Sequence, residues 1–143
     1  MRVLDIDPDF FVQGVAHFRW REKGRLDGKE FPPWSLDDVL RFLLDQCGLE
    51  TGDGGFSKVP GVAIEYHADL FVVWREAIQR GRLELPLSVT HLDAHADLGM
   101  GDPGYAYLMT ELIFLPVDER AHHEALGDHI HDGNFLAFAA ACR

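Results

Sequence analysis

Cysteine is scarce in this sequence, which holds only Cys47 and Cys142 among its 143 residues. The two cysteines lie far apart and form no CxxC or CxxH pattern. This spacing argues against a disulfide framework and against a cysteine zinc site. We expect both to be helix residues that face a hydrophobic core.

Long apolar runs are also missing. The longest apolar stretches, Leu112–Val117 and Phe135–Cys142, are far shorter than the roughly 20 residues that a membrane-spanning helix needs. No signal-peptide pattern opens the chain. We therefore expect a soluble, cytoplasmic protein that has no membrane partner.

Basic residues are few: 13 Lys and Arg stand against 24 Asp and Glu, for a formal net charge of -11 at pH 7. A chain of this charge repels a nucleic-acid backbone and attracts cations. We expect no nucleic-acid partner and a substrate that carries positive charge.

What the sequence does contain suits one globular domain. Its residues are 47% hydrophobic, and a chain of this length buries about two-thirds of its unfolded surface. No internal repeat is visible, so residues 1–143 are predicted to form a single domain. The last predicted helix is cut at Arg143, as expected of a fragment of a longer domain, and the sequence leaves homo-oligomer formation open.

Short apolar, partly β-branched segments alternate with helical patterns along the chain. The predicted strands are Arg2–Ile6, Val62–Tyr66 and Leu87–Leu92. The predicted helices are a helix between Ser35 and Gly48, Ala68–Arg80 with Gly81 as its stop, Tyr105–Leu115 and Asn134–Arg143, while residues 13–34 and Thr51–Pro60 are expected to be loops. This alternation predicts an α/β fold with a mainly parallel sheet flanked by helices on both faces.

Acids and histidines lie at the ends of the three predicted strands. They read Asp5-x-Asp7, Glu65-x-His67 and Asp93-x-His95-x-Asp97. Ligands gather at the carboxyl ends of the strands in parallel sheets, and residues at i, i+2 and i+4 of an extended segment share one side. Bridging carboxylates with outer imidazoles are what a pair of divalent ions needs.

Each element also has a structural interpretation. An Asp-x-Asp after a strand is commonly a turn or helix cap, and a lone histidine such as His67 at a helix start is commonly a cap or a packed residue. The run from Asp93 to Asp97 is harder to explain in this way. Burying its charges without a cation costs several kcal/mol apiece.

Four segments resemble a known family. "LDAHAD" at 92–97 and "LDIDPDFF" at 4–11 resemble the metal motifs of ureohydrolases such as arginase and agmatinase. Together with "EYHADLFVVWREA" and "DGNFLAFAAACR", they resemble a divergent ureohydrolase-like family that includes the peptide arginases of ribosomal-peptide biosynthesis. Because Asp-x-Asp comes first here and second in ordinary arginases, the implied fold is arginase/deacetylase-like with a rearranged strand order.

The resemblance implies two Mn²⁺ ions and hydrolysis of a peptide arginine to ornithine and urea. One ion would be held by His67, Asp93, Asp97 and Asp5, and the other by His95, Asp93, Asp5 and Asp7. Asp97 and His95 are the expected catalytic residues, with Asp97 orienting the nucleophile and protonating the leaving amine. Free arginine or another small guanidino compound is the other expected substrate.

The residue that grips the substrate stays open. Glu65 and Asn134 are candidate substrate-binding residues, with Asp9 and Glu111 as further acids, although Asn134 also fits a helix N-cap. Four histidines near the C-terminus (His122, His123, His129 and His131) are expected on a solvated surface. The competing functions are a single-zinc amide hydrolase of the deacetylase type and a non-catalytic binding module stabilised by metal.

Overall fold

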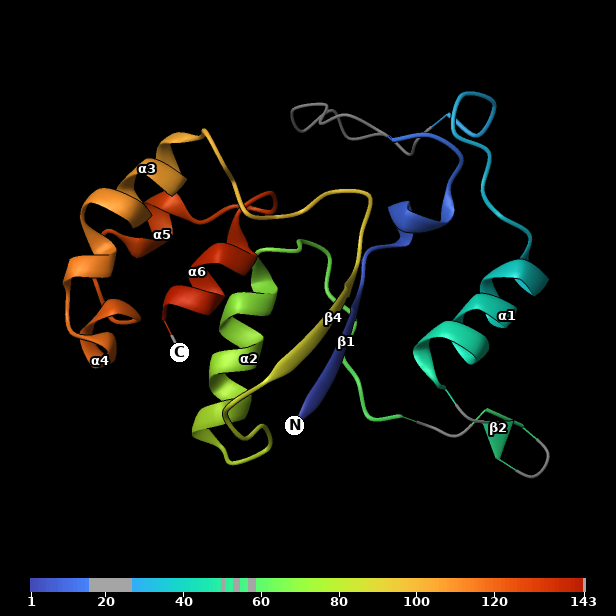
Figure 1. Ribbon diagram of the computed structural model, residues 1–143, viewed down its shortest axis with the longest axis horizontal. Coiled ribbons are helices and arrows are strands. Elements are labelled where there is room, and N and C mark those ends of the chain that lie inside the picture. Colours follow the sequence, from blue (N-terminus) through green and yellow to red (C-terminus); the bar gives the residue numbers. More distant parts are fainter. Residues whose placement is uncertain (16–26, 50, 53–54, 57–58, 143) are drawn as a thin grey trace. The chain divides into compact units, whose positions relative to one another are not determined.

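The computed structural model describes residues 1–15, 27–49, 51–52, 55–56 and 59–142. It combines helices and short strands (Figure 1), a mixture that is compatible with the predicted α/β class. The chain divides into two compact units. Unit 1 comprises Met1–Val3, Ala63–Ser88 and His95–Arg143, and unit 2 comprises Leu4–Val62 and Val89–Ala94.

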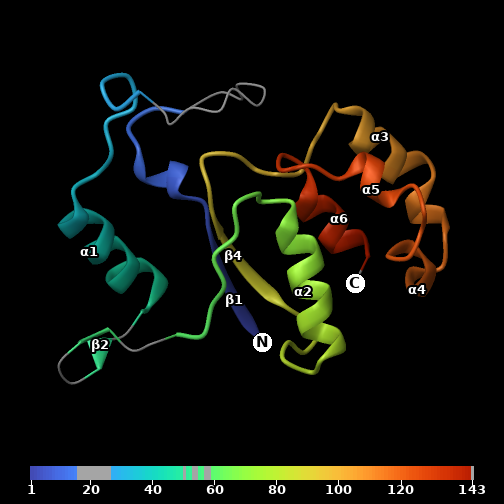
Figure 2. The same ribbon diagram turned by 180° about the vertical axis from the view of Figure 1, so that it is seen from behind.

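Two of the three predicted strands form and pair with each other. Strand β1 (Arg2–Ile6) lies beside β4 (Ser88–Leu92) in a two-stranded sheet, as Figures 1 and 2 show from opposite sides. Ser88 N donates to Met1 O at 2.9 Å, and Asp7 N donates to Leu92 O at 2.8 Å. Because the partners advance in the same direction along both strands, the pair is parallel.

The predicted strand Val62–Tyr66 was wrong. These residues form no strand, and the backbone bends at Glu65 and Tyr66. Val62 and Tyr66 are 60% and 57% exposed, so the segment buries neither face. A strand needs a hydrogen-bonded neighbour and a packed face as well as apolar composition. In the described residues, the expected larger sheet is therefore reduced to two strands.

The loops were predicted with partial success. Residues 27–34 contain turns and one isolated bridge, Val12 to Pro33, as expected of a loop, while residues 16–26 lie outside the described part. Thr51–Pro60, predicted as loop throughout, contains a short antiparallel hairpin of β2 (Thr51–Gly52) and β3 (Gly55–Phe56). Residues 53–54 and 57–58 lie outside the described part of the chain.

Unit 2 is organised around helix α1 (Leu36–Cys47), which has the predicted ends. Ser35 is its N-cap, with Oγ accepting from Asp38 N at 3.2 Å, and Gly48 closes it with a φ of 65°. Unit 2 also contains an aromatic cluster: Phe10 and Phe11 of the short 3-10 helix η1 (Pro8–Phe11), together with Trp34 and Phe42. Their ring centroids lie 5.2 to 6.2 Å apart, so the cluster joins α1 to η1.

Unit 1 is helical. It contains α2 (Asp69–Gln79), α3 (Pro103–Thr110), η2 (Leu112–Phe114), α4 (Val117–Arg120), α5 (Leu126–His129) and α6 (Phe135–Ala141). Helices α2 and α6 lie side by side, and α3 packs on α5 (Figures 1 and 2). The core between them includes Phe71, Leu112 and Phe138, and the last two have no exposed surface.

The predicted helix Tyr105–Leu115 is interrupted. Helix α3 ends at Thr110, Glu111 leaves the helical region with φ −130° and ψ −61°, and η2 follows. Beyond the interruption Leu112 is fully buried, so core packing outweighs helix continuity here.

The histidine-rich segment is not simply a solvated surface. The His123 ring nitrogen Nδ1 lies 2.7 Å from Tyr107 Oη, and the His129 ring stacks on Tyr107 at a centroid distance of 3.9 Å. His131 Nε2 lies 3.0 Å from Asp102 Oδ2. His122 is exposed, as expected. Three of these four side chains therefore contact other parts of unit 1.

Both cysteines are free thiols on or next to helices. Cys142 caps α6 and belongs to the core of unit 1, as predicted, whereas Cys47 of α1 is half-buried. No helix in the described part of the chain is long and apolar enough to cross a membrane.

Substitution of Gly104 tests the packing of unit 1. A Cβ at this position would collide with the His129 carbonyl oxygen and the Asn134 amide nitrogen, whereas a Cβ at Gly127 of α5 would meet nothing within 4 Å. We expect Gly104→Ala to lower the free energy of unfolding by about 1 to 3 kcal/mol. Gly127→Ala should be neutral or raise it by up to about 1 kcal/mol. Denaturant titration of both variants checks this, and equal effects would contradict the packing described.

The Cys142 thiol provides a second test. Burial raises the pKa of Cys142 to about 11 from 9.0, against the opposing effect of the Arg75 and Arg120 guanidiniums. The raised pKa means that the thiol contributes stability that is complete below pH 9 and is lost as the pH rises towards 11. In a Cys47→Ser variant we expect negligible alkylation at pH 8 until denaturant is added. Rapid labelling of the native variant at pH 8 would show that the thiol is accessible and ionised.

Candidate functional site

The predicted metal ligands fall in both units. Asp5, Asp7 and Asp93 belong to unit 2, and His67, His95 and Asp97 belong to unit 1. Within each unit the structure brings some of these residues into contact, and each set is described by its own contacts.

In unit 2 the parallel strands place a histidine between two aspartates. His91 of β4 directs Nδ1 at Asp5 Oδ2 of β1 at 2.8 Å, a hydrogen-bond distance. Its other nitrogen, Nε2, lies 3.6 Å from Asp93 Oδ2, which is ion-pair range. The side chains of Asp5 and Asp93 are only 4% and 1% exposed. Two buried carboxylates, one from β1 and one from the residue that follows β4, therefore meet at one imidazole.

The Asp7–Asp9 turn joins this set through the backbone. Asp7 Oδ1 accepts from Asp9 N at 3.0 Å and caps η1, which is the structural role that Asp-x-Asp commonly has after a strand. Asp9 Oδ1 accepts from Ala94 N at 3.1 Å. The turn after β1 is thus held against the segment that carries Asp93.

In unit 1 His67 and Asp97 form a second imidazole–carboxylate pair. His67 Nδ1 lies 3.0 Å from Asp97 Oδ2, and the side chains are 10% and 5% exposed. The His67 ring packs on Phe135 with the centroids 4.5 Å apart. Asp97 O accepts from Leu136 N at 3.2 Å. Helix α6 and its N-terminal cap region therefore hold both members of the pair.

Asp97 has an unusual backbone. Its φ is 46°, and it is the one non-glycine residue in the described chain with a positive φ. Aspartate tolerates this region better than most residues, but the conformation still costs energy and persists where surrounding contacts impose it. Such outliers cluster at functional sites. The run from Asp93 to Asp97 is not the extended segment that the sequence predicts, because β4 ends at Leu92 and the backbone bends at Ala94 and His95.

The remaining candidates differ in burial. His95 is half-buried in the loop of unit 1 that leads to Asp97, and Glu65 is exposed at the bend before His67. Glu111 is exposed at the end of α3. None of these positions identifies a residue that grips a substrate.

Asn134, a candidate for substrate binding, is fully buried. Its Oδ1 accepts from His131 N at 2.8 Å, and its Nδ2 donates to His129 O at 2.9 Å. It occupies the N-cap position of α6 without a side-chain capping bond. In this conformation its amide braces the segment before α6.

His91 is not among the ligands that the sequence predicts. It lies inside β4, yet it is the residue that contacts both Asp5 and Asp93. A signal was available, because His91 extends the alternation of Asp93, His95 and Asp97 by one step towards the N-terminus.

The donors in the two sets are carboxylate oxygens and imidazole nitrogens, the side-chain groups that bind Mn²⁺, Fe²⁺ and Zn²⁺ in proteins. An imidazole beside a buried carboxylate can be a protonated partner or can share a cation with it. Both the His91 set and the His67–Asp97 pair thus fit a divalent metal by chemical type.

Comparison of the chain with protein-family models, with curated proteins and with solved structures found no match.

Variants of His91 separate its two contacts. We expect His91→Ala to lower the free energy of unfolding, measured with a chelator present, by about 1 to 3 kcal/mol because buried Asp5 loses a hydrogen-bond partner. Asparagine places an amide where Nδ1 lies, and glutamine places one near Nε2. His91→Asn should therefore recover more stability than His91→Gln. Equal recovery by both would show that the contact with Asp5 is not the important one.

Proposed function

We propose that this protein is a metal-dependent hydrolase of the arginase type, which uses two Mn²⁺ ions to cleave the guanidino C–N bond of an arginine side chain in a peptide. The observation that carries the proposal is the set of buried aspartates held by imidazoles, Asp5 and Asp93 at His91 and Asp97 at His67. The motif resemblance supports the choice of reaction.

The proposed ligands are Asp5, Asp7, His67, Asp93, His95 and Asp97. Their four aspartates carry four negative charges, which two divalent cations would neutralise. Oxygen-rich ligands with few imidazoles favour Mn²⁺ over Zn²⁺. Charge balance and donor type therefore support a pair of manganese ions. The same proposal includes an arginase-like fold with a rearranged strand order, of which β1 and β4 would form part of the parallel sheet.

The chain's own residues would bind, orient and transfer protons. When bound, the metal pair lowers the pKa of a coordinated water and so supplies a nucleophile near neutral pH. Asp97, held by His67 at 3.0 Å, would accept a hydrogen bond from the attacking group and pass the proton to the leaving amine. The strained backbone of Asp97 and its contact with Leu136 N fix the carboxylate for this role.

The substrate class follows from charge. The formal net charge of -11 attracts a cationic guanidinium, and a peptide arginine agrees with the resemblance better than free arginine does. Hydrolysis would give an ornithine residue and urea.

The test is metal analysis combined with urea detection. We expect two manganese ions per chain after reconstitution and release of urea from an arginine-bearing peptide. Asp93→Asn should lose metal and reduce kcat by about 100-fold or more. The matched control is Asp118→Asn, which removes an exposed carboxylate of α4 and should match the wild type in both assays.

Other outcomes identify the alternatives. One zinc per chain with cleavage of an acyl-lysine amide would indicate the deacetylase type. Two metal ions without urea from any guanidino compound would leave a metal-stabilised binding module. Absence of metal binding would refute the proposal itself.

A further inference from the structure

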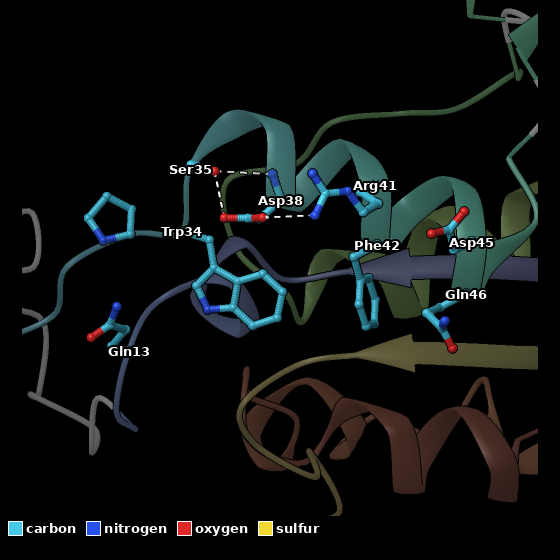
Figure 3. A pocket seen from close by; sticks show the side chains of 9 residues that line it. Gln13, Trp34, Ser35, Asp38, Arg41, Phe42, Asp45 and Gln46 are labelled. Atoms are coloured by element: carbon cyan, nitrogen blue, oxygen red, sulfur yellow. Dashed lines mark hydrogen bonds and ion pairs between the residues drawn. The ribbon is translucent and has the colours of Figure 1, made fainter.

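A pocket of unit 2 has features of a binding site for a cationic side chain. It is a hollow of about 510 Å³, within the range of small-ligand pockets. Figure 3 shows its lining along one face of α1, where Asp38, Arg41, Phe42, Asp45 and Gln46 follow each other at helical spacing. Trp34, which precedes α1, lies beside Phe42 and also lines the pocket.

The pocket combines aromatic rings with an uncompensated acid. Asp38 accepts from Ser35 Oγ at 2.6 Å and lies 3.6 Å from Arg41 Nη1, so its charge is matched (Figure 3). Asp45 is exposed, and Figure 3 draws no hydrogen bond or ion pair from it to the other lining residues. Two carboxylates against one guanidinium leave the pocket with one excess negative charge.

This combination selects among ligands. A guanidinium is flat, stacks on aromatic rings and donates two parallel hydrogen bonds to a carboxylate. Trp34 and Phe42 offer ring surface, while Asp45 and the Gln46 amide offer oxygen acceptors. An anion or a nucleic acid would meet the excess negative charge.

Packing and backbone contacts link the pocket to the turn that carries Asp7. The rings of Trp34 and Phe42 pack on Phe11, and Trp34 N donates to Phe11 O at 2.8 Å. Phe11 ends η1, whose cap is Asp7. A peptide held in the pocket is thus bound by the same unit that carries three of the proposed metal ligands.

We propose that this pocket binds a second arginine side chain of the peptide substrate, apart from the arginine that is cleaved. The inference rests on the proposed function for the identity of the substrate. It predicts that peptides with two arginines bind better than peptides with one, and that Asp45 is responsible for the difference.

The experiment measures binding rather than turnover. Fluorescently labelled peptides with two arginines, or with one arginine and one citrulline, are titrated with the manganese-loaded protein and followed by anisotropy. Asp45→Asn should weaken binding of the two-arginine peptide by about 3- to 10-fold and leave the citrulline peptide unchanged. The matched control, Asp37→Asn, removes an exposed carboxylate of α1 outside the pocket and should bind both peptides like the wild type.

Equal effects of the two variants, or equal losses for the two peptides, would overturn the inference. Asp45-dependent binding without urea release would keep the pocket and refute the hydrolase. Urea release without Asp45-dependent binding would support the hydrolase and refute the second arginine site. Asp45 is exposed, so its replacement leaves the fold intact, and thermal unfolding curves of both variants verify this.

Discussion

The parallel pairing of β1 with β4 is the constraint on which the acidic set of unit 2 depends. Asp5 and His91 are 86 residues apart in sequence, and the pairing brings them to hydrogen-bond distance. A shift of the register by one residue would turn Asp5 to the opposite face of the sheet and separate it from the imidazole. The backbone bond from Asp7 N to Leu92 O continues the same register one residue past the end of β1. Burial of these acids is therefore a consequence of the strand alignment.

Elements whose boundaries are set by neighbouring residues in the sequence could be predicted, whereas elements that depend on distant residues could not. Helix α1 carries its own boundaries, Ser35 at the start and Gly48 at the end, and it was predicted almost to the residue. The segment Val62–Tyr66 has strand composition but forms no strand, because a strand exists only with a partner, and partners are chosen by the tertiary fold. The interruption of α3 at Glu111 has the same origin, since burial of Leu112 is decided by distant neighbours.

The candidate site shows the same division. The position of the acids at the ends of strands predicted that Asp5 and Asp93 would lie at the same edge of a parallel sheet, because ligands gather there. The alternation places His91 on the same side as Asp93, but its contact with Asp5 cannot be predicted from β4 alone, since it requires knowing which strand lies alongside. For Asn134 the sequence left substrate binding and a helix N-cap open, and in the structure its amide bonds two backbone groups of the segment before α6.

Imidazole–carboxylate pairs bear on both stability and the proposed chemistry. Without a metal, an imidazole beside a buried carboxylate offsets part of its desolvation cost, so the set can persist in the folded protein before any ion binds. Ligands already oriented in this way lose less entropy on binding an ion. His91 is not one of the proposed metal ligands, but it holds Asp5 in place by a hydrogen bond. The outer hydrogen-bond partners of metal ligands generally have this role. The same reasoning explains why Asp97 can keep a strained backbone, since its contacts with His67 and Leu136 offset the local cost.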